Sequence, residues 1–300
     1  MTRRNTPRVS FIGFGEAGQA IASGLRESGI ERIAAWDILF PDDAGAPLKA
    51  AGDKIGVRLA KSAADAVAQT DMIVSAVTAA SSIEAARSVA AHLTGNPYYL
   101  DINSVSPGRK QETAKFLGDK ARYVDVAVIA PIHPARHRTP LLISGPHAEA
   151  ISPLLRELEM QPSVVGRETG NAAAIKMIRS VMIKGIEALT LECFLAAARA
   201  GVLEEVTMSL KNNYPTLDWT KIADYNLERM ASHGERRAAE MEESAATLRQ
   251  LGLDPLMVDA TVASQREMGA IGKQAEVREQ LKAGRTALLN AVSTAARDRR

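Results

Sequence analysis

The chain has little cysteine and lacks long apolar runs. One cysteine in 300 residues excludes an internal disulfide and indicates a reducing compartment; because Cys193 has apolar neighbours, we expect it to be buried in packing. No apolar run reaches the roughly 18 residues of a membrane span. Residues 1–4, which include Arg3 and Arg4, resemble the start of a signal peptide, but Glu16 and Gln19 interrupt the apolar stretch that follows. We therefore predict a cytoplasmic protein with no membrane partner.

The sequence also lacks an excess of charge of either sign. Its 37 Lys and Arg and 35 Asp and Glu give a formal net charge of +2 and are spread along the chain. A nucleic-acid-binding protein would gather basic residues in a patch or stripe, so we predict no nucleic acid partner. With 46% hydrophobic residues, the chain is able to bury large cores and is long enough for two domains.

A glycine-rich turn near the N-terminus is the most informative stretch present. An apolar run at 9–12 leads into Gly13-Phe14-Gly15-Glu16-Ala17-Gly18, after which small and apolar residues recur at helical spacing. This order predicts a strand, a turn and a helix, with a sharp turn at Gly13, close approach of a pyrophosphate at Gly15 and tight packing at Gly18. We expect the whole turn to bind the phosphates of a dinucleotide.

An acidic residue at the end of the second predicted strand, 32–36, favours one cofactor over another. Asp37 lies nineteen residues after Gly18, where a carboxylate accepts hydrogen bonds from the ribose hydroxyls of adenosine. It would repel a 2′-phosphate, and residues 38–43 offer no Arg or Lys to receive one. We therefore predict NAD rather than NADP. The alternative is a glycine turn without a ligand, followed by an exposed acid.

Strands and helices alternate through the first half of the chain. Ligands of doubly wound sheets bind beyond the carboxyl ends of strands, so Val77, Thr78 and Asn103 are predicted cofactor contacts and Ser104 a substrate contact. Thr78 is explained equally well as a helix cap. Further strands are predicted at 56–60, 71–77, 98–102, 122–129, 141–144 and 163–165.

From residue 169 onward the pattern is helical, with expected helices at 169–200, 203–212, 219–230, 236–251, 256–268 and from 275. The predicted fold is α/β: an N-terminal Rossmann domain with a doubly wound sheet over residues 1–166, then an all-helical substrate and dimerisation domain over 167–300. The apolar helices of the second domain indicate a homodimer.

Two polar stretches are candidates for substrate chemistry. The loop after the strand at 122–129 contains His133, Arg136 and His137, whose positive charge suits a small anionic substrate, although each alone is more often a solvated loop residue. On the helix from 169, Lys176 and Ser180 lie one turn apart on one face. A lysine among small apolar residues can lose its hydration, which suits it to proton transfer; spacing alone favours a solvated lysine.

Residues 8 to 200 resemble the β-hydroxyacid dehydrogenases, the family that includes hydroxyisobutyrate and 6-phosphogluconate dehydrogenases. Residues 11–18 are similar to its F-I-G-x-G-x-M-G motif, residues 101–107 to D-x-S-T-x-x-P, and residues 170–176 to the G-x-x-x-x-x-K helix. The resemblance implies hydride transfer between a nicotinamide cofactor and a small hydroxy acid, with Lys176 as the general acid and base and Ser180 near the substrate. No metal is implied.

Departures from the family pattern leave the substrate open. The family's D-A-P-V-S-G-G loop is matched by residues 125–131, which lack the Ser-Gly-Gly that binds a substrate carboxylate. Ser180 replaces the usual Asn, and Arg236 and Arg237 precede the position of a family lysine; we expect both arginines on a solvated face. The chain looks like an offshoot whose helical domain has no assigned function. Imine reduction, or nucleotide sensing without turnover, remains an alternative.

Overall fold

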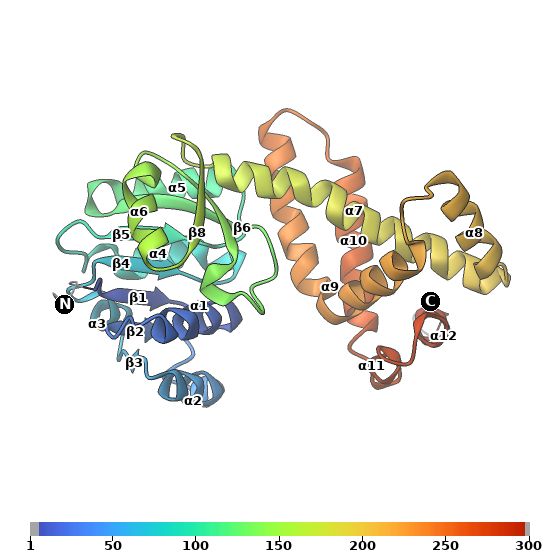
Figure 1. Ribbon diagram of the computed structural model, residues 1–300, viewed down its shortest axis with the longest axis horizontal. Helices are drawn as coiled ribbons and strands as arrows, with labels where there is room; N and C mark the ends of the chain where they lie inside the picture. The colour runs from blue at the N-terminus through green and yellow to red at the C-terminus, as the bar shows by residue number, and fades with distance from the viewer. Residues whose placement is uncertain (1–5, 298–300) are drawn as a thin grey trace. The chain divides into compact units, whose positions relative to one another are not determined.

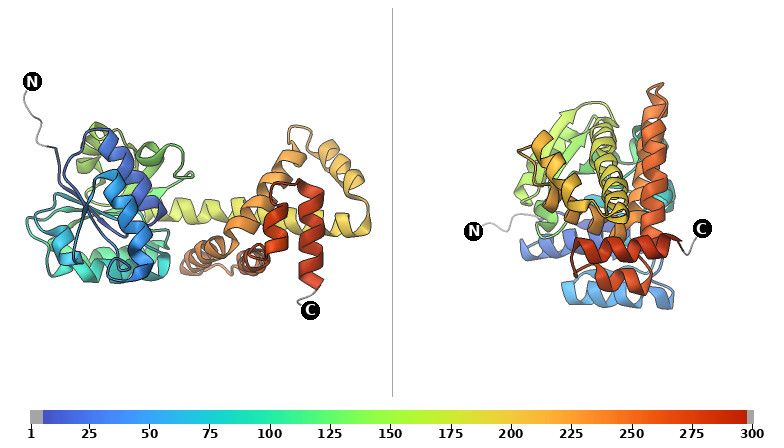
Figure 2. Two further views of the ribbon diagram at one scale, coloured as in Figure 1. Left: turned by 90° about the horizontal axis from the view of Figure 1, so that it is seen from below. Right: turned by 90° about the vertical axis from the view of Figure 1, so that its right-hand side faces the viewer.

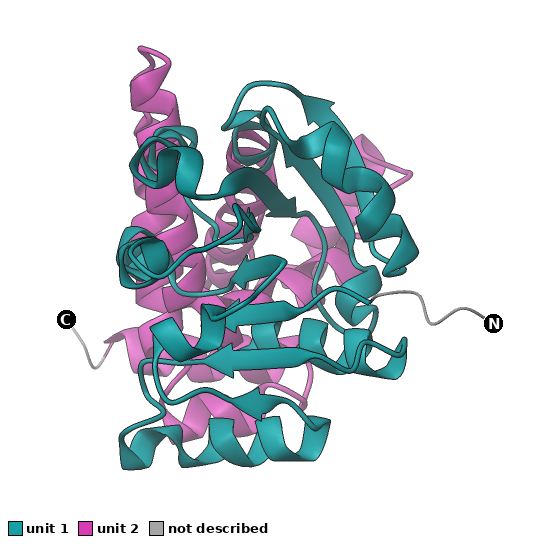
Figure 3. Cartoon of the chain, turned by 90° about the vertical axis from the view of Figure 1, so that its left-hand side faces the viewer, with its two compact units in different colours: residues 1–176 teal, residues 177–300 magenta. Residues whose placement is uncertain are grey.

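The computed structural model of the chain describes residues 6–297 and has two compact units. Unit 1 comprises residues 1–176 and unit 2 residues 177–300 (Figure 3). The sequence predicts a boundary at residue 166, whereas the units divide inside helix α7 (Asn171–Ala200), because the first turn of that helix is bonded to the sheet of unit 1. Within residues 6–297, no helix has both the length and the apolar character needed to cross a membrane.

Unit 1 is built on one sheet, which has eight strands within the described part of the chain. The strand order is β3-β2-β1-β4-β5-β6-β7-β8; the first six are parallel, and β7 runs antiparallel to β6 and parallel to β8. The order reverses between β1 and β4, the place where doubly wound sheets bind ligands. The strands are β1 (Val9–Ile12), β2 (Ile33–Trp36), β3 (Arg58–Leu59), β4 (Met72–Ser75), β5 (Tyr98–Asp101), β6 (Arg122–Val128), β7 (Pro140–Ser144) and β8 (Gln161–Gly166).

Helices cover both faces of this sheet (Figure 1), as the predicted fold requires. Neighbouring residues of a strand point to opposite faces, so Phe11 and Val74 pack in one core while Ile73 and Tyr99 pack in another. Helices α1 and α6 contribute to the first core and α3, α4 and α5 to the second. The helices are α1 (Glu16–Glu27), α2 (Ala46–Ile55), α3 (Ala63–Val67), α4 (Ser82–Ala90), α5 (Pro107–Leu117) and α6 (Ala148–Glu157).

Unit 2 is helical, as the sequence predicts. Its main core includes Phe194, Met230 and Leu289, and α7 enters it as one unbroken helix (Figures 1 and 2). Helices α9 and α10 approach closely because Gly234, Gly269 and Gly272 lie where they cross. After α7 come α8 (Leu203–Asn213), α9 (Trp219–Gln250), α10 (Leu256–Ile271), α11 (Ala275–Gln280) and α12 (Arg285–Arg297).

Two expectations for this unit are wrong. Cys193 is exposed, because Leu191 and Phe194, which are 9% and 1% exposed, already form the core-facing side of that turn of α7. The two helices expected at 219–230 and 236–251 are the single helix α9. Gly234 lies inside this helix, where its missing side chain leaves room for the backbone of α10.

Candidate functional site

The glycine-rich turn joins β1 to α1 and provides three different environments. Gly13 has a φ of +89°, and a Cβ there would lie 2.6 Å from Cγ1 of Val77, so only glycine fits the turn. A Cβ on Gly18 would lie 2.7 Å from the carbonyl oxygen of Gly13, which keeps the helix close to the strand. A Cβ on Gly15 would meet no protein atom within 4 Å. The side of Gly15 on which a Cβ would stand is therefore open, and the backbone there is accessible.

Helix α1 begins directly after Gly15, and because the N-cap residue is a glycine, its position supplies no side chain to cap the helix. The N–H groups of a first helical turn have no intrahelical partner and attract anions. Of the predicted contacts here, Glu16 is exposed and Ala17 half-buried, whereas the ring of Phe14 packs in the core. Phe14 can therefore meet a ligand only through its backbone.

The Asp37 carboxylate lies beside this turn. Its Oδ2 accepts the N–H of Phe14 at 2.7 Å, and its Oδ1 accepts the N–H of Leu39 at 3.0 Å. These two bonds fix the acid at the carboxyl end of β2, where it remains half-buried. The next residue, Ile38, is 81% exposed, so an apolar side chain lies next to the acid on the surface.

The predicted contacts at the ends of β4 and β5 are held together by Asn103. Its Oδ1 accepts the N–H of Val77 at 2.7 Å, and its Nδ2 donates to Ser75 Oγ at 2.9 Å. Because the side chain is 4% exposed and both of its polar ends are bonded, Asn103 fixes the strand ends. Thr78 is exposed at the start of the short helix η2 (Ala79–Ser81), and its hydroxyl donates to Ser81.

Lys176 and Ser104 are brought into contact. The Lys176 Nζ donates to the Ser104 Oγ at 2.6 Å, and both side chains are half-buried. Ser104 follows Asn103 at the carboxyl end of β5, and Lys176 is on the second turn of α7. An amine and a hydroxyl therefore lie together at the carboxyl ends of the strands, where doubly wound sheets bind ligands. The sequence predicts each residue separately, whereas the contact itself depends on tertiary structure.

A buried ionic cluster of one lysine and two aspartates in unit 1 was not predicted from the sequence. Lys110 is 0% exposed, and its Nζ lies 3.1 Å from Asp101 Oδ1 and 3.5 Å from Asp125 Oδ1. Both carboxylates are also 0% exposed. Their positions inside apolar strand sequences are the pattern that indicates them, because a buried carboxylate requires a cation or several hydrogen bonds.

In the loop after β6, Arg136 and His137 contact other residues of the protein. Arg136 forms a bidentate pair with Glu27 at 2.5 Å, roughly 16 Å along α1 from the helix start. The ring of His137 is 2% exposed, and its Nε2 lies 3.1 Å from Ser28 Oγ. Burial lowers the pKa of His137, which disfavours its cationic form. These contacts hold the loop on α1 and give no support to a substrate contact; His133 is exposed.

In unit 2, Ser180 and Arg237 take part in buried polar contacts that join α7 to α9, whereas the Arg236 side chain is exposed. Ser180 is buried, with the Lys184 Nζ at 3.5 Å; burial lowers the pKa of Lys184, and Glu240 pairs with it at 2.8 Å. The expectation of a solvated face is wrong for Arg237, which is 6% exposed. Its Nε donates to Glu187 at 3.0 Å, since that buried carboxylate needs a cation.

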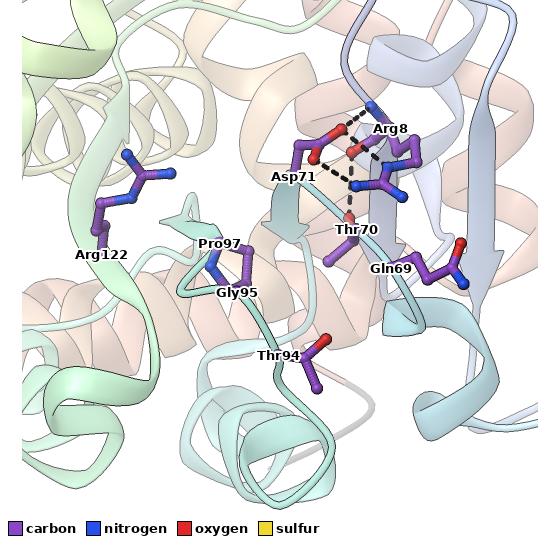
Figure 4. A pocket seen from close by; sticks show the side chains of 8 residues that line it. All are labelled: Arg8, Gln69, Thr70, Asp71, Thr94, Gly95, Pro97 and Arg122. Carbon is purple, nitrogen blue, oxygen red and sulfur yellow. Dashed lines mark hydrogen bonds and ion pairs between the residues drawn. The ribbon is translucent and has the colours of Figure 1, made fainter.

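Two cavities formed by described residues lie away from the residues predicted to bind cofactor or substrate. One of about 280 Å³ lies at the amino ends of the strands, the opposite edge from Ser104 (Figure 4). It is polar, and Arg8 is held there by Asp71 at 2.8 Å. The other, about 480 Å³, lies between helices of unit 2 beside His233 and Lys273. Residues 6–297 contain no cluster of His, Cys, Asp and Glu suited to a metal ion.

Comparison with known proteins gives two family matches. Residues 8–163 match the NAD binding domain of 6-phosphogluconate dehydrogenase, and residues 197–268 match a domain of unknown function, DUF1932. The match to the first family includes the glycine turn, Asp37, Ser104 and the loop after β6.

Three relatives cover most of the chain. A conserved hypothetical protein from Sinorhizobium meliloti is 36% identical, with a TM-score of 0.76 over 96% of each chain. A conserved protein of unknown function, whose structure reveals similarity with 3-hydroxyacid dehydrogenases, is 30% identical with a TM-score of 0.70, over 88% of this chain and 97% of that one. An uncharacterized 28.5 kDa protein from Methanothermus fervidus is 27% identical over 85% of this chain and 96% of that protein.

More distant structures share the fold alone. A 3-hydroxyisobutyrate dehydrogenase from Mycobacterium tuberculosis is 14% identical, with a TM-score of 0.70 over 96% of this chain and 99% of that one. An imine reductase from Myxococcus stipitatus, in complex with NADP+, is 23% identical, with a TM-score of 0.54 over 95% of this chain and 99% of that one.

Proposed function

The chain belongs to the family of the NAD binding domain of 6-phosphogluconate dehydrogenase, and on that premise we propose that it is an NAD-dependent dehydrogenase of small hydroxy acids. The contact between Lys176 and Ser104 is the observation on which the proposal rests. It places an amine beside a hydroxyl at the carboxyl end of the parallel sheet, where substrates of this fold react.

The residues of the glycine turn fit a dinucleotide. The open side of Gly15 and the first turn of α1 would hold the pyrophosphate, and Asp37 would accept the ribose hydroxyls. The exposed Ile38 offers an apolar surface to the adenine ring. The bound nicotinamide supplies a hydride acceptor, or a donor in the reverse direction.

The proton is the part of the reaction that the protein's own residues handle. In oxidation, the Lys176 Nζ in its neutral form takes the proton of the substrate hydroxyl, and in reduction the ammonium form returns it. Ser104 positions that amine through its Oγ and can hydrogen-bond the same substrate oxygen. Removing Lys176 should therefore reduce turnover to a small residual rate without loss of cofactor binding.

We propose NAD rather than NADP because a 2′-phosphate would approach the Asp37 carboxylate. Residues 38–43 contain two further acids and no Arg or Lys that would pair with that phosphate. The imine reductase that shares the fold was solved with NADP+, so the preference of this chain rests on Asp37 and its surroundings.

Imine reduction is the second candidate, and the loop after β6 favours it in one respect. The cations expected to bind a substrate carboxylate are occupied: Arg136 pairs with Glu27, and His137 is buried with its pKa lowered. A substrate without a carboxylate would not require them. Such a substrate would receive its proton from the same Lys176.

We further propose that the protein is a homodimer formed through unit 2. Ile178, Met182, Ile186 and Leu189 recur at helical spacing on α7 and are 47%, 65%, 40% and 56% exposed. A contiguous apolar stripe of this kind is typical of a protein interface. Sedimentation of wild type beside a Met182→Lys variant tests this, and equal monomeric behaviour of both would contradict it.

The deciding experiment measures NADH formation on a panel of 3-hydroxy and sugar acids, and NADH consumption on cyclic imines. Wild type is compared with Lys176→Ala and with Lys115→Ala, an exposed lysine on α5, while NADH binding is followed by fluorescence. We expect turnover on one class, lost in Lys176→Ala alone, with NADH bound by all three. Equal turnover in Lys176→Ala would remove this lysine from the mechanism, and NADH binding without any turnover would indicate a sensor.

A further inference from the structure

The first turn of α7 is capped by side chains of the sheet rather than by its own residues. Asp125 Oδ2, on β6, accepts the N–H groups of Gly170 and Ala173, each at 3.1 Å. Ser144 Oγ, on β7, accepts the N–H of Ala172 at 3.0 Å and donates to the same Asp125 oxygen at 2.9 Å. A cap from a neighbouring residue would fix only the local backbone, whereas this cap fixes α7 against two strands. The helix position therefore depends on where the Asp125 carboxylate lies.

The Asp125 carboxylate needs a cation because it is 0% exposed. Three hydrogen bonds satisfy Oδ2, and Oδ1 faces the Lys110 ammonium at 3.5 Å. Lys110 comes from α5, and its Nζ also donates to the carbonyl oxygens of Asp101 and Val126 at 2.5 and 3.4 Å. The ammonium is thus held at a fixed point between β5 and β6.

The same ammonium fixes the strand end on which Ser104 depends. Lys110 lies 3.1 Å from Asp101 Oδ1, which also accepts the N–H of Asn103 at 3.0 Å. Tyr123 donates its hydroxyl to Asp101 Oδ2 at 2.8 Å, and burial raises the pKa of that phenol, which keeps it a donor. Asn103 precedes Ser104 in the chain, so Asp101 holds the turn that presents the serine.

We infer that Lys110 is a positioning residue for Lys176: by joining Asp101 to Asp125, it holds the start of α7 at the distance at which Lys176 meets Ser104. The Lys110 ammonium lies near Asp101, which holds the turn before Ser104, and near Asp125, which caps the helix that carries Lys176; these are the two partners of the 2.6 Å contact. The inference rests on the proposed function for the role of Lys176 in proton transfer, but the mechanical link is a property of unit 1 alone.

The test compares Lys110→Met with Lys115→Met, an exposed lysine on the same helix, by turnover and by hydrogen exchange of peptides covering the start of α7. In Lys110→Met, kcat should fall by about 10- to 100-fold, because displacement of a reacting group by about 1 Å can cost that much. NADH affinity should fall much less than kcat, because the glycine turn is untouched and only Asn103 among the predicted cofactor contacts is bonded to Asp101. Amide exchange at residues 170–174 should accelerate by about tenfold. Lys115→Met should change none of these quantities.

A double-mutant cycle separates positioning from general loss of stability. If Lys110 acts through Lys176, then adding Lys110→Met to Lys176→Ala should leave the residual rate unchanged. If Lys110→Met alone fails to fold, the pair Lys110→Met and Asp101→Asn removes one carboxylate together with the ammonium and should show the same changes in exchange and kcat.

The outcomes distinguish this inference from the proposed function. Unchanged exchange at 170–174, or faster exchange with an unchanged kcat, would overturn the positioning role. An additive fall in the double variant would overturn it as well. If wild type turned over no substrate, the proposed function would fail, and faster exchange in Lys110→Met, with the Lys115→Met control unaffected, would still support the link between Lys110 and α7.

Discussion

Replacing Gly15 by alanine should separate cofactor binding from folding. A Cβ at Gly15 would meet no protein atom within 4 Å, and the residue's φ of −74° and ψ of −160° suit alanine. The loss of backbone freedom in the unfolded chain stabilises the variant by about 0.4–1 kcal/mol. The loss of glycine at the N-cap of α1 costs about 0.5–1 kcal/mol. The two effects offset each other, so the Tm should change by no more than about 2 °C.

The added methyl group occupies the open side of the turn, where the pyrophosphate would approach. We expect NADH binding to weaken by at least about tenfold, which corresponds to roughly 1.4 kcal/mol. Fluorescence titration with NADH measures the affinity, and thermal melting measures the stability. If a folded Gly15→Ala variant bound NADH as tightly as wild type, the assignment of the turn to the pyrophosphate would be refuted.

Two further glycines serve as controls for Gly15→Ala. At Gly18 the added Cβ would lie 2.7 Å from the Gly13 carbonyl oxygen, so Gly18→Ala should lose about 1–3 kcal/mol of stability from overpacking. At Gly185, inside α7, a Cβ meets nothing within 4 Å, and alanine should stabilise the helix by about 0.5–1 kcal/mol. Gly185→Ala should leave NADH affinity unchanged.

Three further predictions concern His137, Arg237 and Asp37, and Arg236 provides a control for Arg237. Burial lowers the pKa of His137, so between that lowered pKa and about 6.5 the unfolded chain binds more protons than the folded one. The free energy of unfolding should therefore fall as the pH drops through this window. Thermal melting across about pH 5 to 7.5 should show a smaller fall for His137→Gln than for wild type. Arg237→Met leaves Glu187 buried without its cation and should cost about 3–5 kcal/mol. Arg236→Met, in which the lost side chain is 57% exposed, should change stability by less than about 0.5 kcal/mol, and equal Tm values for the two variants would contradict the burial argument. Asp37→Ser should raise the affinity for NADPH relative to NADH by about tenfold, and an unchanged ratio in competitive titrations would remove Asp37 as the source of the preference.

Local patterns were sufficient to predict the doubly wound sheet and the helical second half. The glycine turn could be predicted because the roles of Gly13 and Gly18 depend on residues close in sequence or on the neighbouring strand end. Asp37 follows from its position after a strand. In each case the determining contacts lie within one strand–turn–helix repeat, so periodicity and spacing are enough.

Side chains whose partners are distant in sequence could not be predicted. Arg136 and His137 occur in a loop with no periodicity, and they contact Glu27 at the end of α1 and Ser28 directly after it, each 109 residues earlier in the chain. Lys110 belongs to a helix whose other basic residues are accessible, so nothing local distinguishes it. The two aspartates that pair with Lys110 are easier to recognise in the sequence, because Asp101 and Asp125 lie in apolar strands and a buried charge requires a partner.

The exposed thiol of Cys193 makes the protein easy to study by magnetic resonance. Since the sequence contains one cysteine and the structure places it at the surface of α7, a nitroxide spin label can be attached at a single point without mutagenesis. Each chain then carries one unpaired electron. Any dipolar coupling detected between labels must come from a second copy of the chain, so its presence reports association and its frequency gives the distance between the two labels.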